Sequence, residues 1–598
     1  MALFSKVLVA NRGEIAVRVF RTLRELGIGT VAVYSEADRS ALHVRRADEA
    51  YLIGPGPANQ SYLVGERVIE AAQRSGAEAI HPGYGFLAEN ARFAEAVEAA
   101  GITWIGPPPS AIDAMGSKTA ARDLMKKAGV PIVPGTTDPV ESADEVARLG
   151  DEIGWPIAIK AAAGGGGKGI KVVRGRDEVE AAYASAKREG LAYFGDDTIY
   201  VEKFIEDPRH VEVQVLADSH GNVIHLGERD CSIQRRHQKL IEESPSPAVT
   251  PELRATIGTV AINAARAVGY RSAGTIEGLL AHDGNYYFLE MNTRIQVEHT
   301  VTELVTGLDL IREQVLIAAG HPMSVTQADV QFRGHAIECR INAENPSNGF
   351  LPSPGLITHY KEPTGIGVRV DSGVEAGSEI APLYDPMIAK LIVLDTNRET
   401  ARRRMLRALD EFEVGGVKSL LGFHRALLRH PAFIEGGTCH GIVESELLAL
   451  QAEELTVDEY PAAAGGAGGG AAGLRERTAS VELNGRRFDV KVMEPVADFV
   501  ALGHRRRERE LSGGGHNAAT EAVVSPMQGT MLAVKVTAGE HVRAGQVLCI
   551  IEAMKMENEV TAHRDGVVQN ITSGPGQPVK TGQVICLVVA GEEEPTPT

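Results

Sequence analysis

Long apolar runs are missing from the sequence. No uncharged apolar stretch reaches the roughly 18 residues that a helix needs to span a bilayer. The apolar stretch at the start is too short for a signal peptide, and Arg12 and Glu14 follow it closely. These absences predict a cytoplasmic protein without a membrane partner.

Cysteine is also scarce, and positive charge is not in excess. The five cysteines form no C-x-x-C pair, which argues against a zinc site or a disulfide framework and favours reduced, structural thiols. Lysine and arginine number 61 against 79 aspartates and glutamates, so the net charge is −18. Negative charge disfavours a nucleic-acid backbone as the main partner, but nucleotides stay open because a small local site can bind them.

A Walker A loop is absent, and the glycine signature of a dinucleotide site is missing from the first turn, although Gly164, Gly166 and Gly169 match G-x-G-x-x-G, which alone is a weak signal. Residues 6–35 have the strand–helix–strand pattern that opens an α/β domain, but their first turn lacks the G-x-G-x-x-G of a dinucleotide site. The run Gly164–Gly167 is followed by Lys168 and Gly169, whereas a Walker A loop needs Ser or Thr after its lysine. Strand-like segments flank this run, which predicts a flap whose backbone N–H groups can close over phosphates. A flexible hairpin without a ligand explains the glycines equally well.

Length and composition divide the chain into parts. At 598 residues the prior is about four domains. Strands and helices alternate to about residue 450, and two low-complexity stretches follow, at 461–475 (Ala and Gly) and 501–521 (charged, then Gly-rich). Each predicts a flexible tether with a reach on the order of 20–25 Å, and the arginines of the second are interpreted as solvated linker residues. Between them, alternating residues around Asn484-Gly485 predict a β-hairpin.

The last segment contains an internal repeat. HVRAGQVLCII from His541 matches PVKTGQVICLV from Pro578, and glycines recur at the same offset. The repeat predicts two similar half-sheets that pack about a pseudo-two-fold axis, with Lys555 of AMKM at the connection between them. A lysine between two methionines can be a solvated turn residue above a core. Its place at the apex favours display of the amine, so that another group can be attached to it.

One predicted hairpin brings two carboxylates together. Asp283-Gly284 is a two-residue turn signal, and in that register Glu277 faces Glu290 with Cβ atoms about 4.5–5.5 Å apart. Two ionised carboxylates so placed repel unless a cation lies between them, and Mg²⁺ with oxygen ligands fits. The second strand is expected to continue a polar alternation through Glu290, Asn292, Arg294, Gln296 and Glu298. A solvated sheet face is the alternative, but it predicts Lys, Ser or Thr among these positions.

Lysines near the glycine run can supply charge for a nucleotide. Lys160 ends the strand before the run and Lys118 lies in MGSKTAAR, so both can hold phosphates as point charges. The segment YVEKFIEDPRHVE carries Glu202, Ile205 and His210. These residues predict backbone contacts to adenine and polar contacts to ribose.

These elements resemble biotin carboxylase, an ATP-grasp enzyme. The resemblance covers about residues 3–445 and rests on HPGYGFLAEN, MGSKTAAR, KAAAGGGGKGIK, ERDCSIQRRHQKLIEE, EMNTRIQVEHTVTE and GHAIECRINAEN. Residues 523–589 resemble a biotinyl (biotin carboxyl carrier) domain with AMKM as its attachment motif, whereas lipoyl domains usually carry Asp-Lys-Ala. The whole is similar to the α subunit of an acyl-CoA carboxylase, of the kind common in actinobacteria. It departs from relatives at Ala163 and Lys168, where Gly and Arg are frequent.

The resemblance implies an α/β and α+β multidomain protein with an all-β carrier at one end. The expected parts are an N-terminal α/β domain (1–112), an ATP-grasp domain (113–330) with a mobile flap at about 132–203, a biotin-carboxylase C-terminal domain (331–448), linkers with a short β segment for partner docking (449–521), an all-β biotinyl hairpin-sandwich domain (522–590) and a tail (591–598). Larger α subunits have a β-barrel interaction domain where this chain has only the 476–500 hairpin region.

The resemblance also implies three ligands: ATP, a divalent cation and biotin bound covalently to Lys555. Mg²⁺ or Mn²⁺ would be held by Glu277, Glu290 and Asn292. The set expected to position ATP is Lys118, Lys160, Gly165, Gly166, Glu202, Lys203, Phe204, Ile205, His210, Gln234, His237 and Leu279.

The implied reaction is the ATP-dependent carboxylation of biotin with bicarbonate. Arg294 would grip bicarbonate, with help from Lys239, Gln296 and the Val297 backbone, and Glu298 would act as the general base. Arg340 would stabilise the enolate oxygen of biotin. An ordinary surface ion pair is the alternative for each arginine taken alone.

Partners follow from the same resemblance. These 598 residues leave no segment for a carboxyltransferase, so a separate carboxyltransferase β subunit is expected to choose the acyl-CoA, in fatty acid biosynthesis. Biotin protein ligase would load Lys555, and α subunits would form homo-oligomers within an αβ complex. The alternatives are the α subunit of a methylcrotonyl-CoA, geranyl-CoA or urea carboxylase, or a catalytically silent biotin carrier scaffold.

Overall fold

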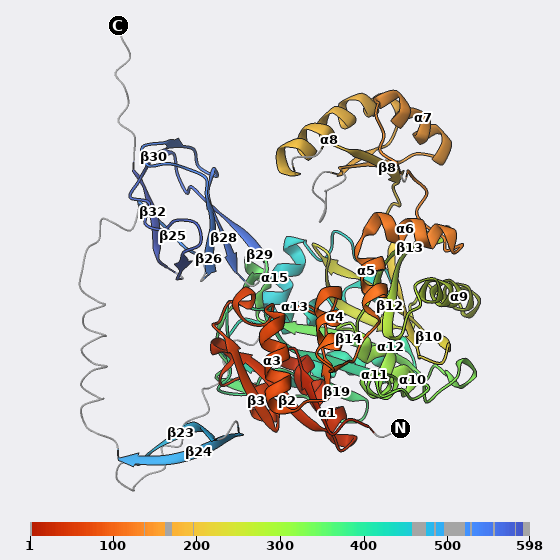
Figure 1. The fold of residues 1–598 in the computed structure, drawn as a ribbon. Coiled ribbons are helices and arrows are strands. Elements are labelled where there is room, and N and C mark those ends of the chain that lie inside the picture. Colours follow the sequence, from red (N-terminus) through yellow and green to blue (C-terminus); the bar gives the residue numbers. More distant parts are fainter. Residues whose placement is uncertain are drawn as a thin grey trace.

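The computed structural model shows a large assembly of mixed sheets and helices, a separate small β domain near the C-terminus and a two-stranded hairpin that lies between these two parts along the chain (Figure 1). It describes residues 3–136, 138–161, 170–194, 197–456, 474–483, 486–495, 521–526, 529–553, 556–580 and 582–589. Within these ranges no helix is long and apolar enough to cross a membrane.

The N-terminal part is a parallel sheet with strand order β3-β2-β1-β4-β5. Its strands are β1 Lys6–Val9, β2 Gly29–Ser35, β3 Glu49–Gly54, β4 Ala79–His81 and β5 Thr103–Trp104, and its helices are α1 Gly13–Glu25, α2 Leu42–Arg46, α3 Gly65–Ser75, α4 Ala91–Ala99 and α5 Pro109–Gly116. Val7 and Val9 of β1 pack with Ile15 of α1, whereas Leu8 packs with Phe93 of α4. Both faces are therefore buried, which explains why the strands are continuously apolar.

The central sheet has eight strands in the order β13-β12-β9-β10-β11-β14-β21-β19. These are β9 Arg209–Ala217, β10 Val223–Arg235, β11 Gln238–Ser244, β12 Ser272–Leu280, β13 Tyr286–Asn292, β14 His335–Asn342, β19 Val368–Ser372 and β21 Met387–Asp395, with helices α9 Pro251–Ala267, α10 His299–Thr306 and α11 Leu310–Ala318. Because β11 pairs with β14, one continuous sheet runs through the boundary expected at residue 330. Side chains from both sides of that boundary can therefore share one sheet face.

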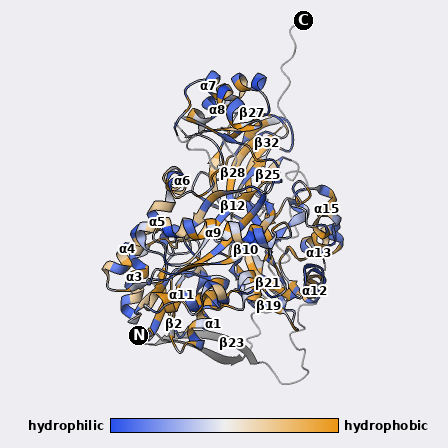
Figure 2. Cartoon of the chain, turned by 90° about the vertical axis from the view of Figure 1, so that its right-hand side faces the viewer, coloured by the Kyte–Doolittle hydropathy of each residue, from blue (hydrophilic) through white to orange (hydrophobic). Residues whose placement is uncertain are grey.

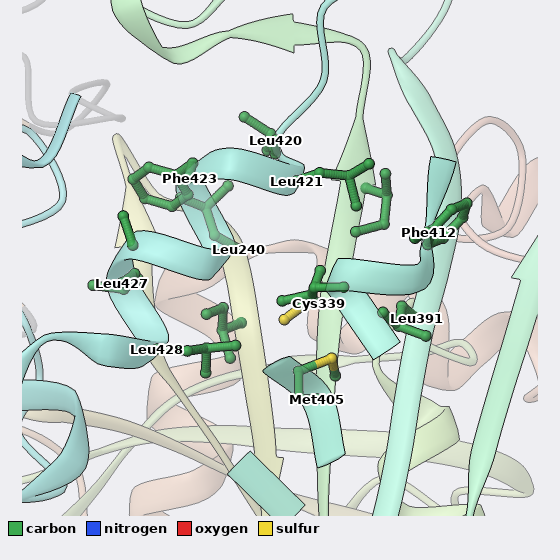
Figure 3. Close-up of a cluster of buried hydrophobic side chains, with 14 of the residues drawn as sticks. Leu240, Cys339, Leu391, Met405, Phe412, Leu420, Leu421, Phe423, Leu427 and Leu428 are labelled. Carbon is green, nitrogen blue, oxygen red and sulfur yellow. The ribbon is translucent and has the colours of Figure 1, made fainter. Parts of the chain in front are cut away.

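A buried apolar cluster covers one face of this sheet over strands β11, β14 and β21 (Figure 3). Its helices are α12 Arg398–Glu411, α13 Leu421–Arg429, α14 Pro431–Ile434 and α15 Glu446–Glu454, and short strands β15 Glu344–Asn345, β16 Leu351–Pro352, β17 Gly355–Leu356, β18 His359–Lys361, β20 Glu379–Ile380 and β22 Glu413–Gly415 complete the region. Cys339 of β14 and Leu391 of β21 meet Met405 of α12 there. Because strand side chains alternate, Glu338 and Arg340 face the opposite side of the sheet.

A small three-stranded unit, β7-β6-β8, forms the expected flap region. It contains β6 Ile157–Ala161, β7 Ile170–Val173 and β8 Ile199–Lys203 with α7 Ala143–Ile153 and α8 Val179–Phe194, and α6 Lys118–Lys127 precedes it. β6 and β7 are antiparallel neighbours, which confirms the two strands predicted on either side of the glycine run. The run itself lies outside the described residues.

The C-terminal domain is a sandwich of two four-stranded sheets, β25-β32-β30-β27 and β29-β28-β26-β31. The strands are β25 Ala522–Val524, β26 Gly529–Val534, β27 His541–Val542, β28 Val547–Ala553, β29 Met556–Thr561, β30 Gly566–Gln569, β31 Pro578–Val579 and β32 Val584–Val589. The repeated segments β27–β28 and β31–β32 occupy matching positions in opposite sheets, so the predicted half-sheets are confirmed. Met531 and Val588 belong to the single core between them.

Along the chain, a hairpin of β23 Leu474–Leu483 and β24 Arg486–Pro495 lies between residues 3–456 and this sandwich. Leu483 pairs with Arg486, which confirms the hairpin predicted around residues 484–485, although that turn itself lies outside the described residues. Figure 2 shows the general pattern of the fold, with apolar segments along the inner strands and hydrophilic residues on outward-facing parts of the helices.

Candidate active site

The hairpin β12–β13 places Glu277 directly opposite Glu290, as predicted. The turn differs from the prediction, because Leu280 pairs with Tyr286 and leaves a three-residue turn, 282–284, in place of a two-residue one. A β-bulge next to Glu277 absorbs the extra residue and restores the predicted pairing. The two carboxylates therefore share one face of the sheet.

The strand β13 ends at Asn292, so the expectation that it continues in polar alternation to residue 298 is wrong. The backbone N–H of Thr293 donates to Glu89 Oε1 at 3.0 Å instead of joining the ladder with β12. Residues 293–298 form a loop, and Glu298 is the N-cap residue of α10. Contact with the N-terminal part thus takes the chain out of the sheet while keeping its polar side chains at the hairpin.

Lys239 of β11 lies at the centre of these carboxylates. Its Nζ is 2.6 Å from Glu212 Oε2, 3.0 Å from Glu277 Oε1 and 2.6 Å from Glu298 Oε1. Burial acts to lower the pKa of Lys239, but Glu212 and Glu298 hold that pKa well above its ordinary value. A permanently charged ammonium therefore links strands β9, β11 and β12 to the start of α10.

Glu277 accepts several donors. Its Oε1 accepts from Asn292 Nδ2 at 2.7 Å and from Gln296 Nε2 at 2.6 Å, and its Oε2 is 2.8 Å from His210 Nε2. Burial acts to raise the pKa of Glu277, but Lys239 and His210 hold it below its ordinary value. The carboxylate is therefore ionised, as a metal-binding carboxylate must be.

Arg229 of β10 belongs to the same network, and sequence reasoning missed it. It is fully buried, and its Nε donates to Glu212 Oε1 at 2.5 Å. Its terminal nitrogens donate to Gln214, Thr275, Gln296 and Thr302 at 2.7–3.1 Å. The alternation in β9 could have indicated such a residue. Glu212 and Gln214 alternate there with completely buried valines, and polar groups at that depth need hydrogen-bond partners.

Arg340 of β14 bridges two carboxylates. Its Nε donates to Glu242 Oε1 at 2.5 Å, and its Nη2 donates to Glu298 Oε2 at 2.8 Å. Glu298 is thus held on one oxygen by Lys239 and on the other by Arg340. Arg340 and Glu298, both predicted as catalytic, are in direct contact.

Arg294 lies slightly apart from that pair. Its Nε donates to Glu89 Oε2 and its Nη2 to Asn292 Oδ1, both at 2.8 Å, and its Nη1 donates to the backbone carbonyl of Ile295. Glu89 comes from the segment HPGYGFLAEN, which was recognised as a motif but not as a source of site residues. A carboxylate from the N-terminal part therefore orients the predicted bicarbonate-binding arginine.

The residues predicted to position ATP come mainly from the flap region and from β9. Lys160 of β6 is ion-paired with Glu202 of β8, and Arg122 Nη1 lies 3.5 Å from the other Glu202 oxygen. The Lys203 ammonium donates to the backbone carbonyls of Gly154 and Trp155 at 3.0 and 2.7 Å. The Lys203 side chain is thus used to stabilise the flap. A ligand at this segment would therefore contact its backbone groups and not the Lys203 ammonium.

Three other residues of the predicted ATP-binding set, His210, Gln234 and Leu279, lie together on β9, β10 and β12. Gln234 Nε2 is 2.8 Å from His210 Nδ1, and His210 pairs with Leu279 across β9 and β12. His237 lies in the exposed turn between β10 and β11, with a φ of 67°. Ile205 and Phe204 follow β8 and are half-buried.

Several predicted positions lie outside the described part of the chain. These are Gly165, Gly166 and Lys555, together with the side chain of Lys118, whose backbone begins α6. The predictions for them stay predictions.

The residues at the hairpin fit a hard divalent cation. Glu277 and Glu290 are opposite one another, and Asn292 lies on the same face two residues farther along β13. Ligand atoms of His210, Glu212 and Glu277 also lie within 4.8 Å of one another. Oxygen donors of this kind suit Mg²⁺, and a further cation would offset the excess of carboxylates around Lys239.

The arrangement can therefore bind an anion and remove a proton from it. Lys239, Arg294 and Arg340 provide fixed positive charge, and Glu298 provides a buried carboxylate between two of them. Preorganised charge in a buried site is effective because it needs little reorganisation as new charge develops.

The chain matches four family descriptions in order. They are "Biotin carboxylase, N-terminal domain" over residues 3–112, "Carbamoyl-phosphate synthase L chain, ATP binding domain" over 117–326, "Biotin carboxylase C-terminal domain" over 338–445 and "Biotin-requiring enzyme" over 521–588. Three of the four therefore describe the part that contains the site.

Similar proteins agree with these matches. The chain is 56% identical over 435 residues to Biotin carboxylase 1 of Bacillus subtilis, covering 73% of this chain and 97% of that protein. It is also similar to the biotin carboxylase domain dimer of the Hydrogenobacter thermophilus 2-oxoglutarate carboxylase, solved with MgADP, ADP and bicarbonate, with a TM-score of 0.68, 49% identity and coverage of 74% of this chain and 99% of that one.

One relative includes the carrier as well. The biotin-dependent acyl-coenzyme A carboxylase alpha3 subunit of Mycobacterium leprae is 46% identical over 580 residues, which cover 95% of this chain and 96% of that subunit. With an ATP-grasp ligase site on the central sheet and a biotin-requiring sandwich in the same polypeptide, the chain belongs to the biotin carboxylase family.

Proposed function

We propose that the chain is the α subunit of an acyl-CoA carboxylase of the kind common in actinobacteria. It would use ATP and bicarbonate to carboxylate biotin carried on Lys555, and then supply the carboxyl group to a separate carboxyltransferase β subunit. The alignment with the Mycobacterium leprae subunit supports this proposal most, because it runs through both the carboxylase and the carrier.

The first chemical step would be the activation of bicarbonate by Glu298. Burial acts to raise the pKa of Glu298, but Lys239 and Arg340 hold it well below its ordinary value, so this carboxylate is ionised and ready to take a proton. A bicarbonate ion that draws the Lys239 ammonium toward itself removes part of that stabilisation, and the proton affinity of Glu298 then rises. The deprotonated bicarbonate oxygen would attack the γ-phosphorus of ATP as the bond to ADP breaks.

Arg294 would orient bicarbonate for that attack. Its guanidinium is fixed by Glu89 and Asn292, so its direction is set before the substrate arrives. A planar guanidinium matches the two oxygens of bicarbonate, and Gln296 and the Val297 backbone lie in the same loop. Fixing the reacting groups in this way lowers the entropic part of the barrier.

Arg340 would act in the second step, when biotin accepts the carboxyl group. Removal of the N1 proton places negative charge on the ureido oxygen, and a guanidinium already held in place stabilises that charge. The phosphate released with CO₂ can accept the N1 proton. Lys160, Glu202, His210 and the flap would position the nucleotide.

The divalent cation would lie at the β12–β13 hairpin. Glu277, Glu290 and Asn292 would hold Mg²⁺ or Mn²⁺, which supplies neutralising charge to the phosphate oxygens when it is bound. Asn292 also contacts Arg294, so the cation-binding and bicarbonate-binding residues are mechanically connected.

Two proteins would act with this chain: a carboxyltransferase β subunit and biotin protein ligase. A β subunit would dock in the 449–521 region, where β23 and β24 form the hairpin, and it would choose the acyl-CoA chain length. Biotin protein ligase would load Lys555, α subunits would associate within an αβ complex, and the complex would act in the cytoplasm. Assays of the co-purified complex with acetyl-, propionyl- and long-chain acyl-CoA would identify the acceptor.

A direct experiment separates this enzyme from a silent carrier scaffold. We expect the purified chain to release ADP from MgATP only when bicarbonate is present, and free biotin should increase the rate. The Glu298→Gln variant serves as the matched control, because it keeps the size of the side chain but cannot accept the proton. ADP release that ignores bicarbonate, or none at all, contradicts the proposal.

A further inference from the structure

Two glutamates beside Arg340 have no place in the mechanism above. Glu242 of β11 and Glu338 of β14 are direct cross-strand partners, and both are completely buried. Side chains at such positions have Cβ atoms about 4.5–5.5 Å apart. Two acidic groups at this separation and depth need an explanation, because like charges so close together repel strongly.

Each of these carboxyl groups has one hydrogen-bonded oxygen and one without a partner. Glu242 Oε1 accepts from Arg340 Nε, and Glu338 Oε2 accepts from the Thr300 hydroxyl of α10. Among the described residues, Glu242 Oε2 and Glu338 Oε1 accept no hydrogen bond. Buried acceptors without donors are costly, and a single proton on one carboxyl group would satisfy both atoms at once.

We propose that Glu242 and Glu338 share one proton, held mainly on Glu338, and that this acid pair positions Arg340 for carboxyl transfer to biotin. The O–H of Glu338 would donate to Glu242 Oε2. Glu242 would then be satisfied on both oxygens, by Glu338 on one and by Arg340 on the other. The inference deepens the proposed function and rests on the role given there to Arg340.

The proton belongs on Glu338 because the two residues have different partners. Glu242 touches a guanidinium, which favours its ionised form, whereas Glu338 touches the neutral hydroxyl of Thr300. Burial raises the pKa of both groups, and it raises that of Glu338 well above its ordinary value. A neutral acid next to an ionised one is the usual result for such a pair.

The charged groups around the pair do not remove the need for this proton. Arg340 is shared with Glu298, and Lys239 already contacts Glu212, Glu277 and Glu298. Lys390, the strand neighbour of Arg340, has its Nζ 3.3 Å from Glu14 Oε2. Every cation that faces the pair from β11, β14 or β21 is thus committed to another carboxylate.

The consequence for Arg340 is mechanical. Glu242 holds its Nε and Glu298 holds its Nη2, so both contacts together fix the plane of the guanidinium. If Glu242 lost its own support, it could tilt toward another donor and Arg340 would follow. Glu242 and Glu338 are therefore positioning residues, since they act on the reaction through Arg340.

Neutral substitutions at residue 338 test the proposal. We expect Glu338→Gln to keep kcat and kcat/KM for free biotin within about twofold of wild type, because its amide N–H replaces the carboxyl O–H as the donor. Glu338→Leu has no donor, and it should lower kcat/KM for free biotin about tenfold while the KM for ATP changes less than about twofold. Glu313→Gln, a change at another buried glutamate that binds Ser324 instead, is the control and should leave these values unchanged.

An infrared measurement observes the proton directly in the full-length chain. The wild-type spectrum minus that of Glu338→Gln should show a protonated-carboxyl absorption at neutral pH that shifts in D₂O, whereas the wild-type spectrum minus that of the control should not. The difference is needed because burial also raises the pKa of Glu344, to about 7, and that group absorbs in both spectra. Absence of this band from the difference spectrum overturns the proposal, as does a Glu338→Gln variant that loses biotin turnover to the same extent as Glu338→Leu. The spectrum keeps the test decisive if Glu338→Leu does not fold.

Failure of this inference can be told apart from failure of the proposed function. If wild type shows no bicarbonate-dependent ADP release, the proposed function is wrong, and the infrared result still decides whether the pair shares a proton. If wild type is active and the band is absent or unaffected by Glu338→Gln, only the inference about the pair is wrong.

Discussion

The Nζ atom of Lys390 donates to the carbonyl oxygen of Val297 at 2.9 Å, although the two residues lie on different parts of the fold. Lys390 is completely buried in β21, and Glu14 at the start of α1 lies 3.3 Å from the same ammonium. Val297 immediately precedes Glu298. One buried charge thus connects the N-terminal part, the C-terminal part and the loop that carries the predicted base.

Lys390→Met should therefore disturb bicarbonate activation and stability together. Without the ammonium, the Val297 carbonyl is free to rotate and Glu14 is left without its cation, which costs about 3–5 kcal/mol for a buried pair. We expect the melting temperature to fall, the KM for bicarbonate to rise, and ATP binding to change little. Lys361→Met at an exposed ion pair is the control, and its effect should stay within about 1 kcal/mol. Equal effects of both variants would contradict this assignment.

Glu298→Gln should abolish biotin carboxylation while ATP still binds. The amide cannot take the bicarbonate proton, and loss of a general base typically costs about 10²–10⁴-fold in rate. The measurement is kcat for carboxylation of free biotin, with ATP affinity determined separately by equilibrium binding. Unchanged turnover would refute the assignment of Glu298 as the base.

Arg229→Met should destabilise the central sheet, because it leaves Glu212 as a buried charge with fewer partners. Arg229 and Glu212 are both completely buried and in contact at 2.5 Å, so the cost should be about 3–5 kcal/mol. The double variant Arg229→Met with Glu212→Gln removes the stranded charge, and it should be more stable than the single variant. Thermal unfolding of the four proteins of this cycle measures the coupling, and additive effects would show that the contact is unimportant.

Lys555→Arg should prevent attachment of biotin. Arginine keeps the positive charge but lacks the primary amine that the ligase acylates. Mass spectrometry of chain co-expressed with biotin protein ligase should find the adduct in wild type and not in the variant, whereas carboxylation of free biotin should persist. An adduct on another residue would overturn the assignment of Lys555 as the carrier.

Glu338→Gln should also change how stability depends on pH. Burial raises the pKa of Glu338 well above 4.5, so the folded chain holds a proton that the unfolded chain releases above that pH. This contribution is fully present at low pH and is lost as pH rises, by up to about 1.4 kcal/mol per pH unit for one proton. The variant should therefore lose less stability than wild type as pH rises above 4.5. Parallel losses in urea or thermal unfolding would show that Glu338 is already ionised.

Local sequence was sufficient for features that depend on short-range pairing. The turn signal Asp283-Gly284 predicted that Glu277 and Glu290 oppose each other, and the repeat in residues 541–588 predicted the two matched half-sheets. It failed at the turn after Leu280, where a bulge compensates for an extra turn residue, because a turn signal does not report irregularities elsewhere in the hairpin.

Motifs of the family brought the central residues to attention without showing how they touch. Lys239, Glu298 and Arg340 come from three separate motifs, and the sequence alone determined that they accompany an ATP-grasp fold and a biotin carrier. Periodicity shows which face of a strand is buried, but it does not show which distant element covers that face.

Only the tertiary structure decided the contacts between distant segments. Glu89 reaches Arg294, Lys390 reaches Val297, and Glu242 meets Glu338 because one continuous sheet joins β11 to β14 and the N-terminal part packs against the loop after β13. The physical reason is that a buried charge is stable only beside its partners, and which partners are within reach depends on the packing of whole elements.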